Sequence, residues 1–115
     1  MELIEAMFRD IDACRWLNLH LYFDEKAIYE RPGYSPLEGL NRIYKFYSHE
    51  RIIFEGRHFL DRCVYANDAE GVCCWGTFEG KSRSGDVLNE KFSDVYILKA
   101  GKIVFRRTHF FRPAI

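Results

Sequence analysis

Glu30 is the first residue whose position suggests chemistry. It ends the apolar and aromatic run AIYE, and Arg31, Pro32 and Gly33 follow at once. Because proline cannot donate to a sheet ladder, this run is predicted to be a strand that ends at Glu30. A carboxylate at the mouth of an apolar cavity could move protons near neutral pH. The alternative is a solvated turn in which Glu30 pairs with Arg31.

Asp94 is the second candidate acid. In the stretch LNEKFSDVYILK it shares one strand face with Phe92, Tyr96 and Leu98, which are apolar or aromatic. Burying an unpaired carboxylate is costly, so an acid on such a face needs a partner or a function. The sequence leaves two interpretations open: catalysis or ligand binding, and a buried ion pair with an arginine of the following strand.

Basic side chains could complete a site. Arg106 and Arg107 are neighbours in GKIVFRRTHFF, so only one of them faces a cavity if the sheet is covered on one side. That arginine could hold a ligand carboxylate, phenolate or enolate, or it could neutralise Asp94. His58 is a further candidate because imidazole titrates in the useful range, although a lone strand histidine can equally be a core or surface group.

Aromatic residues make up 17% of the chain, a high share that could line a cavity as well as a core. The candidates for a substrate-binding wall, each with ordinary core packing as its alternative, are Tyr29, Tyr47, Trp75 and Tyr96. No Gly-x-Ser-x-Gly motif and no glycine-rich phosphate loop occurs, which argues against acyl transfer and nucleotide binding. No Cys-x-x-Cys and no short histidine spacing is present, so neither a metal nor another cofactor is expected.

These side chains must be positioned by helices that precede a set of strands. Apolar periodicity predicts helices near 2–12, 14–23 and 37–50, with a short strand at 27–30. From Arg51 onward, stretches rich in β-branched and aromatic residues alternate with the turn signals NDAEG, KSRSGD and KAG. Such short connections favour antiparallel pairing, so the chain is predicted to be α+β, with helices covering one face of a curled sheet.

Length and charge narrow the function classes. The 115 residues predict one domain spanning 1–115, and 17 basic against 17 acidic residues give a formal net charge of zero. No field would attract nucleic acid or an anionic membrane, so neither is expected as a partner. MELIEAMFRD has no basic region typical of a signal peptide, and no stretch is long and apolar enough to span a bilayer, so a cytoplasmic location is expected.

Three phrases together resemble a known family. MFRDIDACRWLNLHLYFDEKAIYERPG, PLEGLNRIYKFY and SDVYILKAGKIVFRRTHFF are similar to the nuclear transport factor 2-like superfamily, and more specifically to its SnoaL-like polyketide cyclase and ketosteroid isomerase branch. The resemblance covers nearly the whole chain. It implies a cone-shaped α+β barrel in which about three N-terminal helices pack in the concave face of a strongly curved, mainly antiparallel sheet.

The resemblance also implies roles for single residues. Glu30 matches the general base at the end of the first strand, and Asp94 matches a second acid on the penultimate strand if the hairpin loop is one residue shorter. It favours Arg106 as the arginine that faces the pocket, and cyclase-like relatives often use a cavity histidine, which keeps His58 a candidate. Met7 stands where the isomerases have a tyrosine, a departure that argues against steroid isomerisation by the same groups.

The first functional interpretation is therefore a cofactor-independent isomerase or cyclase acting on a hydrophobic small molecule, with Glu30 and Asp94 moving protons. Arg106 or His58 would stabilise the developing oxyanion. The alternatives are a non-catalytic binding or accessory dimerisation module of the same fold, and an epoxide hydrolase or dehydratase. A homodimer through the outer face of the sheet, with Phe105 and His109, is expected in every case.

Overall fold

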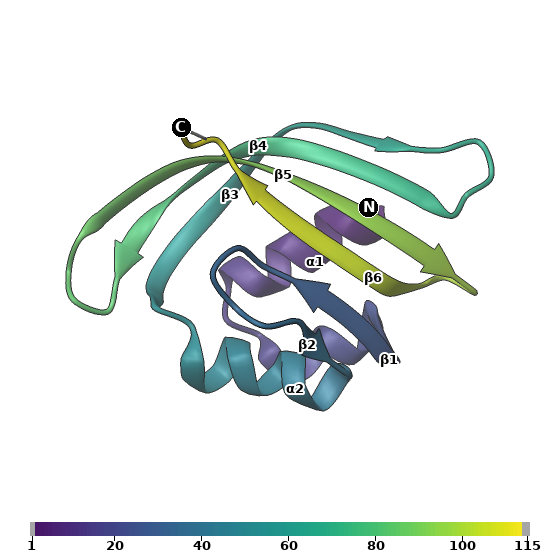
Figure 1. Ribbon diagram of the computed structural model, residues 1–115, viewed down its shortest axis with the longest axis horizontal. Helices are drawn as coiled ribbons and strands as arrows, with labels where there is room; N and C mark the ends of the chain where they lie inside the picture. The colour runs from purple at the N-terminus through teal and green to yellow at the C-terminus, as the bar shows by residue number, and fades with distance from the viewer. Residues whose placement is uncertain (1, 114–115) are drawn as a thin grey trace.

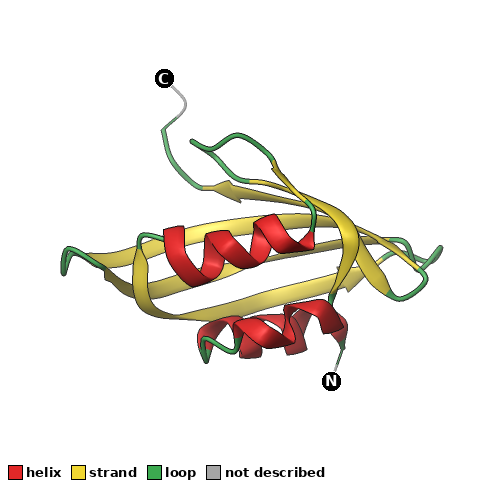
Figure 2. Cartoon of the chain, turned by 90° about the horizontal axis from the view of Figure 1, so that it is seen from below, coloured by secondary structure: helices red, strands yellow, loops and turns green. Residues whose placement is uncertain are grey.

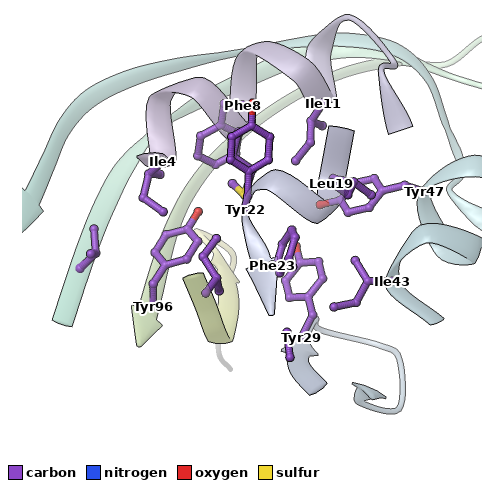
Figure 3. Packing of buried hydrophobic residues seen from close by; sticks show 14 of the residues in the cluster. Ile4, Phe8, Ile11, Leu19, Tyr22, Phe23, Tyr29, Ile43, Tyr47 and Tyr96 are labelled. Carbon is purple, nitrogen blue, oxygen red and sulfur yellow. The ribbon is translucent and has the colours of Figure 1, made fainter. Parts of the chain in front are cut away.

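The first helix, α1 (Leu3–Asp12), forms where the sequence predicts it. Ile4, Met7 and Ile11 recur at helical spacing and are all buried, so the apolar stripe of α1 becomes part of the core. The structure is a computed structural model that describes residues 2–113. Figure 3 shows Ile4, Phe8 and Ile11 pointing from this helix toward Tyr22 and the rest of the buried cluster.

The other predicted helices are shorter than expected. Residues 14–23 form only a 3₁₀ helix, η1 (Trp16–Leu21), and its Leu17 is 78% exposed, so the alternating sequence there does not make a continuous apolar stripe. Residues 37–50 divide into β2 (Leu37–Glu38), α2 (Leu40–Lys45) and a π-helical segment, η2 (Phe46–Glu50). Gly39, with φ of 93°, separates β2 from α2 in a conformation that other residues rarely adopt.

The strands form one six-stranded sheet. They are β1 (Phe23–Glu30), the short β2, β3 (Ile53–Tyr65), β4 (Gly71–Ser82), β5 (Val87–Lys99) and β6 (Lys102–Phe110). Their order is β2-β1-β6-β5-β4-β3, and within residues 2–113 only the β1–β6 pair is parallel. Figure 1 shows the long strands curving over α1, while Figure 2 shows the helices lying across one face of the sheet. The predicted α+β class with a mainly antiparallel sheet is confirmed, although the sheet stays open instead of closing into a barrel.

Glycines allow two strands of this curved sheet to approach closely. A Cβ on Gly56 of β3 would lie 2.1 Å from the Phe78 ring, and one on Gly76 of β4 would lie 2.0 Å from the Phe59 carbonyl oxygen. Only glycine fits at either position. The space over Gly56 is occupied by the Phe78 ring, which helps to form the inner face of the sheet.

Alternation along the strands decides which side chains face the helices. Phe92, Asp94, Tyr96 and Leu98 of β5 are buried, whereas their immediate neighbours are not. None of the helices within residues 2–113 is long and apolar enough to cross a membrane.

Candidate functional site

A cavity of about 430 Å³ lies between the inner face of the sheet, the β1–β2 connection and the segment that follows η2. Such a volume is typical of a small-molecule site. Its lining combines aromatic and aliphatic side chains with several arginines and one histidine. The lining includes Tyr29, Arg31, Tyr47, Arg51, Ile53, His58, Phe78, Leu88, Glu90, Phe92, Arg106, Thr108, Phe110 and Arg112.

Arg106 enters this cavity from β6 and is held by a buried carboxylate. Its Nη2 and Nε donate to Oδ2 of Asp94 at 2.9 and 3.1 Å, and the Tyr96 hydroxyl donates to the same oxygen at 2.6 Å. Asp94 is 0% exposed, and it lies behind Arg106 instead of lining the cavity. Burial opposes the charge on Arg106, but Asp94 and the neighbouring tyrosine hydroxyls together outweigh burial and raise the arginine's pKa well above its usual value. The ion-pair interpretation of Asp94 is therefore the one observed.

The third donor of Arg106 reaches a tyrosine. Arg106 Nη1 donates to the Tyr47 hydroxyl at 2.8 Å. Burial alone would raise the pKa of Tyr47, but Arg106 and the other cavity arginines outweigh burial and lower it. Tyr29, stacked near Tyr47 with ring centroids 6.4 Å apart, bonds to Thr108 Oγ1 at 2.8 Å, and burial raises its pKa to about 12. Tyr47 is thus the more acidic of the two cavity phenols.

This difference can be measured in solution. We expect a near-ultraviolet titration of phenolate absorbance to show a first step below pH 10.0, and we expect Tyr47→Phe to remove it. Tyr29→Phe is the matched control and should leave that first step in place. An unchanged first step in Tyr47→Phe would contradict the arrangement of cations around this phenol.

His58, on β3, forms a pair with an acid that the sequence analysis missed. Its Nδ1 lies 2.6 Å from Asp12 Oδ1, and its backbone N–H donates to Asp12 Oδ2 at 2.9 Å. Burial lowers the pKa of His58 and outweighs the opposite effect of Asp12, so the imidazole is neutral at pH 7. One sequence feature could have pointed to Asp12 as a site residue. It lies one helical turn after Phe8 on α1, and Phe8 is buried.

Aromatic rings fix the orientation of this histidine. The His58 ring lies 4.4 Å from Phe8, 4.8 Å from Phe78 and 5.3 Å from Phe92, measured between ring centroids. With Nδ1 donating to Asp12, the neutral ring keeps the lone pair on Nε2. The site therefore contains a neutral imidazole with a defined tautomer.

Two further arginines of the cavity lining, Arg31 and Arg51, have no carboxylate partner among the described residues. Arg51 is only 6% exposed, and Arg31 carries its guanidinium among Tyr29, Tyr34 and Phe46. The Nε atoms of both arginines are buried without a hydrogen-bond acceptor among the described residues. In the sequence, Arg31 stands out only as a neighbour of Glu30, and Arg51 only as the start of the strand region. An arginine directly beside a predicted strand boundary carries no sequence signal for burial.

Glu30 does not lie at the mouth of the cavity, so that predicted location is wrong. Tyr29 points into the core, and alternation along β1 turns Glu30 to the outer face. There it is paired in register with Arg107 of β6, whose Nε donates to Glu30 Oε1 at 2.6 Å. Glu30 and Asp94 therefore do not share a cavity, whereas the expectation that Arg106 faces inward is met.

Of the four aromatic candidates for the cavity wall, two line the cavity and two do not. Tyr29 and Tyr47 line the cavity, and Tyr96 is buried beside Asp94. Trp75 does not reach it: this side chain lies on the outer face of β4, is 38% exposed and belongs to a separate hollow with His109. Its predicted place in the cavity is therefore wrong. Within residues 2–113, no group of three or more histidine, cysteine, aspartate or glutamate side chains could hold a metal ion.

Comparison with known proteins identifies the fold. No protein-family model matches the chain, and no curated protein matches it. A nuclear transport factor 2-like protein of unknown function from Burkholderia pseudomallei superposes with a TM-score of 0.85 at 16% identity, over 95% of this chain and 88% of that one.

Two further solved structures are similar. A protein from Jannaschia sp. assigned as a SnoaL-like polyketide cyclase gives a TM-score of 0.78 at 10% identity, over 94% of this chain and 82% of that one. A protein with a ketosteroid isomerase-like fold from Catenulispora acidiphila, in complex with trimethylamine, gives a TM-score of 0.82 at 11% identity. The match covers 94% of this chain and 84% of that one. The chain has the nuclear transport factor 2-like fold that SnoaL-like and ketosteroid isomerase-like proteins share.

Proposed function

We propose that the protein is a cofactor-independent enzyme that moves a proton next to a carbonyl group of a small molecule in the cavity, as isomerases and cyclases do. One observation carries this proposal: His58, which is held by Asp12, lines the same cavity as the hydrogen-bonded pair Arg106 and Tyr47. A base on one side and hydrogen-bond donors on the other are what proton abstraction beside a carbonyl requires.

His58 is the proposed general base. It is neutral at pH 7 because burial lowers its pKa, so its Nε2 can accept a proton from carbon. Asp12 is a positioning residue, since its carboxylate fixes the tautomer and would stabilise the imidazolium that forms. Glu30, the base expected from the sequence, is not the proposed base, because it pairs with Arg107 on the outer face and does not line the cavity.

Tyr47 and Arg106 are the proposed oxyanion stabilisers. The Tyr47 hydroxyl accepts a bond from Arg106 and keeps its own proton to donate to a carbonyl oxygen. The cations that lower the pKa of Tyr47 also make it a stronger donor toward an enolate. Asp94 and Tyr96 hold Arg106 from behind without contacting the cavity.

Proton abstraction by His58 can lead to two reactions, isomerisation and aldol-type cyclisation. His58 takes a proton from the carbon beside the carbonyl, and the electron pair moves to the carbonyl oxygen as an enolate. Returning the proton to another carbon gives isomerisation. In aldol-type cyclisation the enolate carbon instead attacks a second carbonyl, and the alkoxide that forms there takes the proton back from His58. Both reactions begin with the same proton abstraction, which can therefore be tested without the natural substrate.

The test is solvent deuterium exchange followed by NMR. We expect the wild-type protein to speed deuterium incorporation beside the carbonyl of aryl ketones such as α-tetralone above the rate in buffer alone. Tyr47→Phe should lower this rate by roughly 100- to 1,000-fold, the range found for loss of one oxyanion donor. Exchange no faster than in buffer across the ketone panel would contradict the proposal.

A second candidate function is small-molecule binding without turnover. The composition of the lining favours it. The only carboxylate among the described lining residues is Glu90, and Glu90 forms an ion pair with Arg112, so no unpaired carboxylate among them lines the cavity to act as a base. The same experiment separates the two functions, since a binding module would hold the ketone and give no exchange above buffer.

We also propose a homodimer through the outer face of the sheet. Phe59, Trp75 and Ile97 are exposed on adjacent strands of that face, at 42%, 38% and 44%. We expect Trp75→Glu to shift the protein to monomer in light scattering, because it places a charge in an apolar interface. Asp61→Glu is a matched control that keeps the charge. A wild-type mass equal to one chain would contradict this assembly.

A further inference from the structure

Four arginines line the cavity, but only two of them have a carboxylate partner among the described residues. Arg106 is paired with Asp94 and Arg112 with Glu90, whereas neither Arg31 nor Arg51 is within ion-pair distance of a carboxylate in the described part of the chain. The cavity therefore carries two positive charges that the described part of the chain does not neutralise.

Arg51 is the clearest case. Its side chain is 94% buried, its Nε has no acceptor in residues 2–113, and burial lowers its pKa. The backbone holds it in place, since its N–H donates to the Phe46 carbonyl at 2.8 Å and its carbonyl accepts from Arg83 Nε at 2.8 Å. A buried cation without a counter-charge destabilises a folded protein. A ligand that supplies the negative charge would remove this penalty.

Aromatic faces carry these cations without using their N–H groups. The Arg51 guanidinium carbon lies 5.3 Å from the Tyr47 ring centroid, and that of Arg31 lies 5.0 Å from the Phe46 ring centroid. Cation–π attraction offsets part of the desolvation and leaves the N–H donors unused. The Arg31 guanidinium makes one hydrogen bond among the described residues, a long one of 3.2 Å from Nη1 to the Tyr29 hydroxyl. Donors remain on both arginines for a planar anion, which guanidinium groups bind with two parallel bonds.

The rest of the lining defines the remainder of the ligand. The cavity also has an apolar wall, formed by Ile53, Phe78, Leu88, Phe92 and Phe110. We propose that the cavity binds an organic carboxylate, with the carboxylate between Arg31 and Arg51 and an aromatic or alicyclic body against this wall. This inference rests on the proposed function, of which it names the substrate class, but it is tested by binding without turnover.

The test compares three probes of the same shape by isothermal titration calorimetry: 2-naphthoate, 2-naphthamide and 2-naphthylmethylammonium. We expect 2-naphthoate to bind about 10- to 100-fold more tightly than the amide, the range for hydrogen bonds to a charged group. The ammonium probe should bind least. Arg51→Met should remove the preference for the anion, while affinity for the amide stays within about twofold.

Controls keep the test independent of folding and of catalysis. Arg107→Met removes an arginine from the outer face, where it pairs with Glu30, and should leave 2-naphthoate binding unchanged. Arg51→Met should keep or raise the melting temperature, because it removes an unpaired buried charge. Arg31→Met gives a second variant at the same anion position and should also weaken 2-naphthoate.

Each result decides one proposal. Equal binding of 2-naphthoate and 2-naphthamide, or unchanged 2-naphthoate binding in both Arg51→Met and Arg31→Met, would overturn the carboxylate inference. Tight, arginine-dependent binding of 2-naphthoate supports it, even if the ketone panel shows no deuterium exchange. Failure of exchange alone therefore overturns only the proposed enzyme activity.

Discussion

Replacing Asp94 by asparagine is expected to lower the free energy of unfolding by about 3–5 kcal/mol, the range for breaking a buried ion pair from one side. Asp94 is 0% exposed and its Oδ2 accepts two bonds from Arg106 and one from Tyr96. Without the carboxylate, the Arg106 guanidinium stays buried with no counter-charge. Urea denaturation monitored by circular dichroism measures the loss.

The same chain supplies two controls for this prediction. Glu30→Gln breaks the half-exposed pair with Arg107 and should cost at most about 1 kcal/mol. The double variant Asp94→Leu with Arg106→Met removes both buried charges and should recover most of the stability, since apolar replacements of buried pairs are often neutral. Equal losses in Asp94→Asn and Glu30→Gln would show that Asp94 does not hold a buried cation.

Replacing His58 by glutamine is expected to slow the proposed proton abstraction by about 100- to 10,000-fold, the usual contribution of a general base. Glutamine can still donate to Asp12, so the local hydrogen bond at 2.6 Å has a substitute and the fold should be kept. The deuterium-exchange assay on the most reactive ketone measures the effect, and circular dichroism checks that the variant is folded.

The exchange rate of the wild-type protein should also depend on pH, in a direction that the pKa of His58 determines. Burial lowers the pKa of His58 below 6.5, and the base works only when the imidazole is neutral. The exchange rate should therefore hold at pH 7 and fall as the pH drops below 6.5 through the lowered value. The folding contribution of His58 has the same direction: it is fully present above pH 6.5 and decreases as the pH falls, because the unfolded state binds the proton more strongly. His58→Gln should lack both effects.

Local patterns in the sequence predicted much of the fold and part of the site. The helical stripe of Ile4, Met7 and Ile11, and the alternation along the later strands, correspond to buried side chains in α1 and β5. Alternation also predicted that Asp94 would be buried and that an arginine of the next strand could neutralise it. These inferences succeeded because they depend on neighbours within one element or one hairpin.

Features that depend on distant contacts were not predicted. Asp12 and His58 are 46 residues apart, and their pairing requires α1 to cross β3. The parallel pairing of β1 with β6 sets Glu30 beside Arg107, which no local pattern around AIYERPG contains. Arg51 is buried, and its guanidinium lies near Trp16 and Phe78, which are far from it in the sequence, so its sequence position resembles that of any surface arginine.

The central claim is that His58 is the base, and not the acid at the end of β1. Deuterium incorporation into the same aryl ketone, measured side by side for wild type, His58→Gln and Glu30→Gln at pH 7, tests it most directly. The arrangement of the cavity predicts wild-type exchange in Glu30→Gln and a loss of at least about 100-fold in His58→Gln. Loss of exchange in Glu30→Gln with normal exchange in His58→Gln would contradict it.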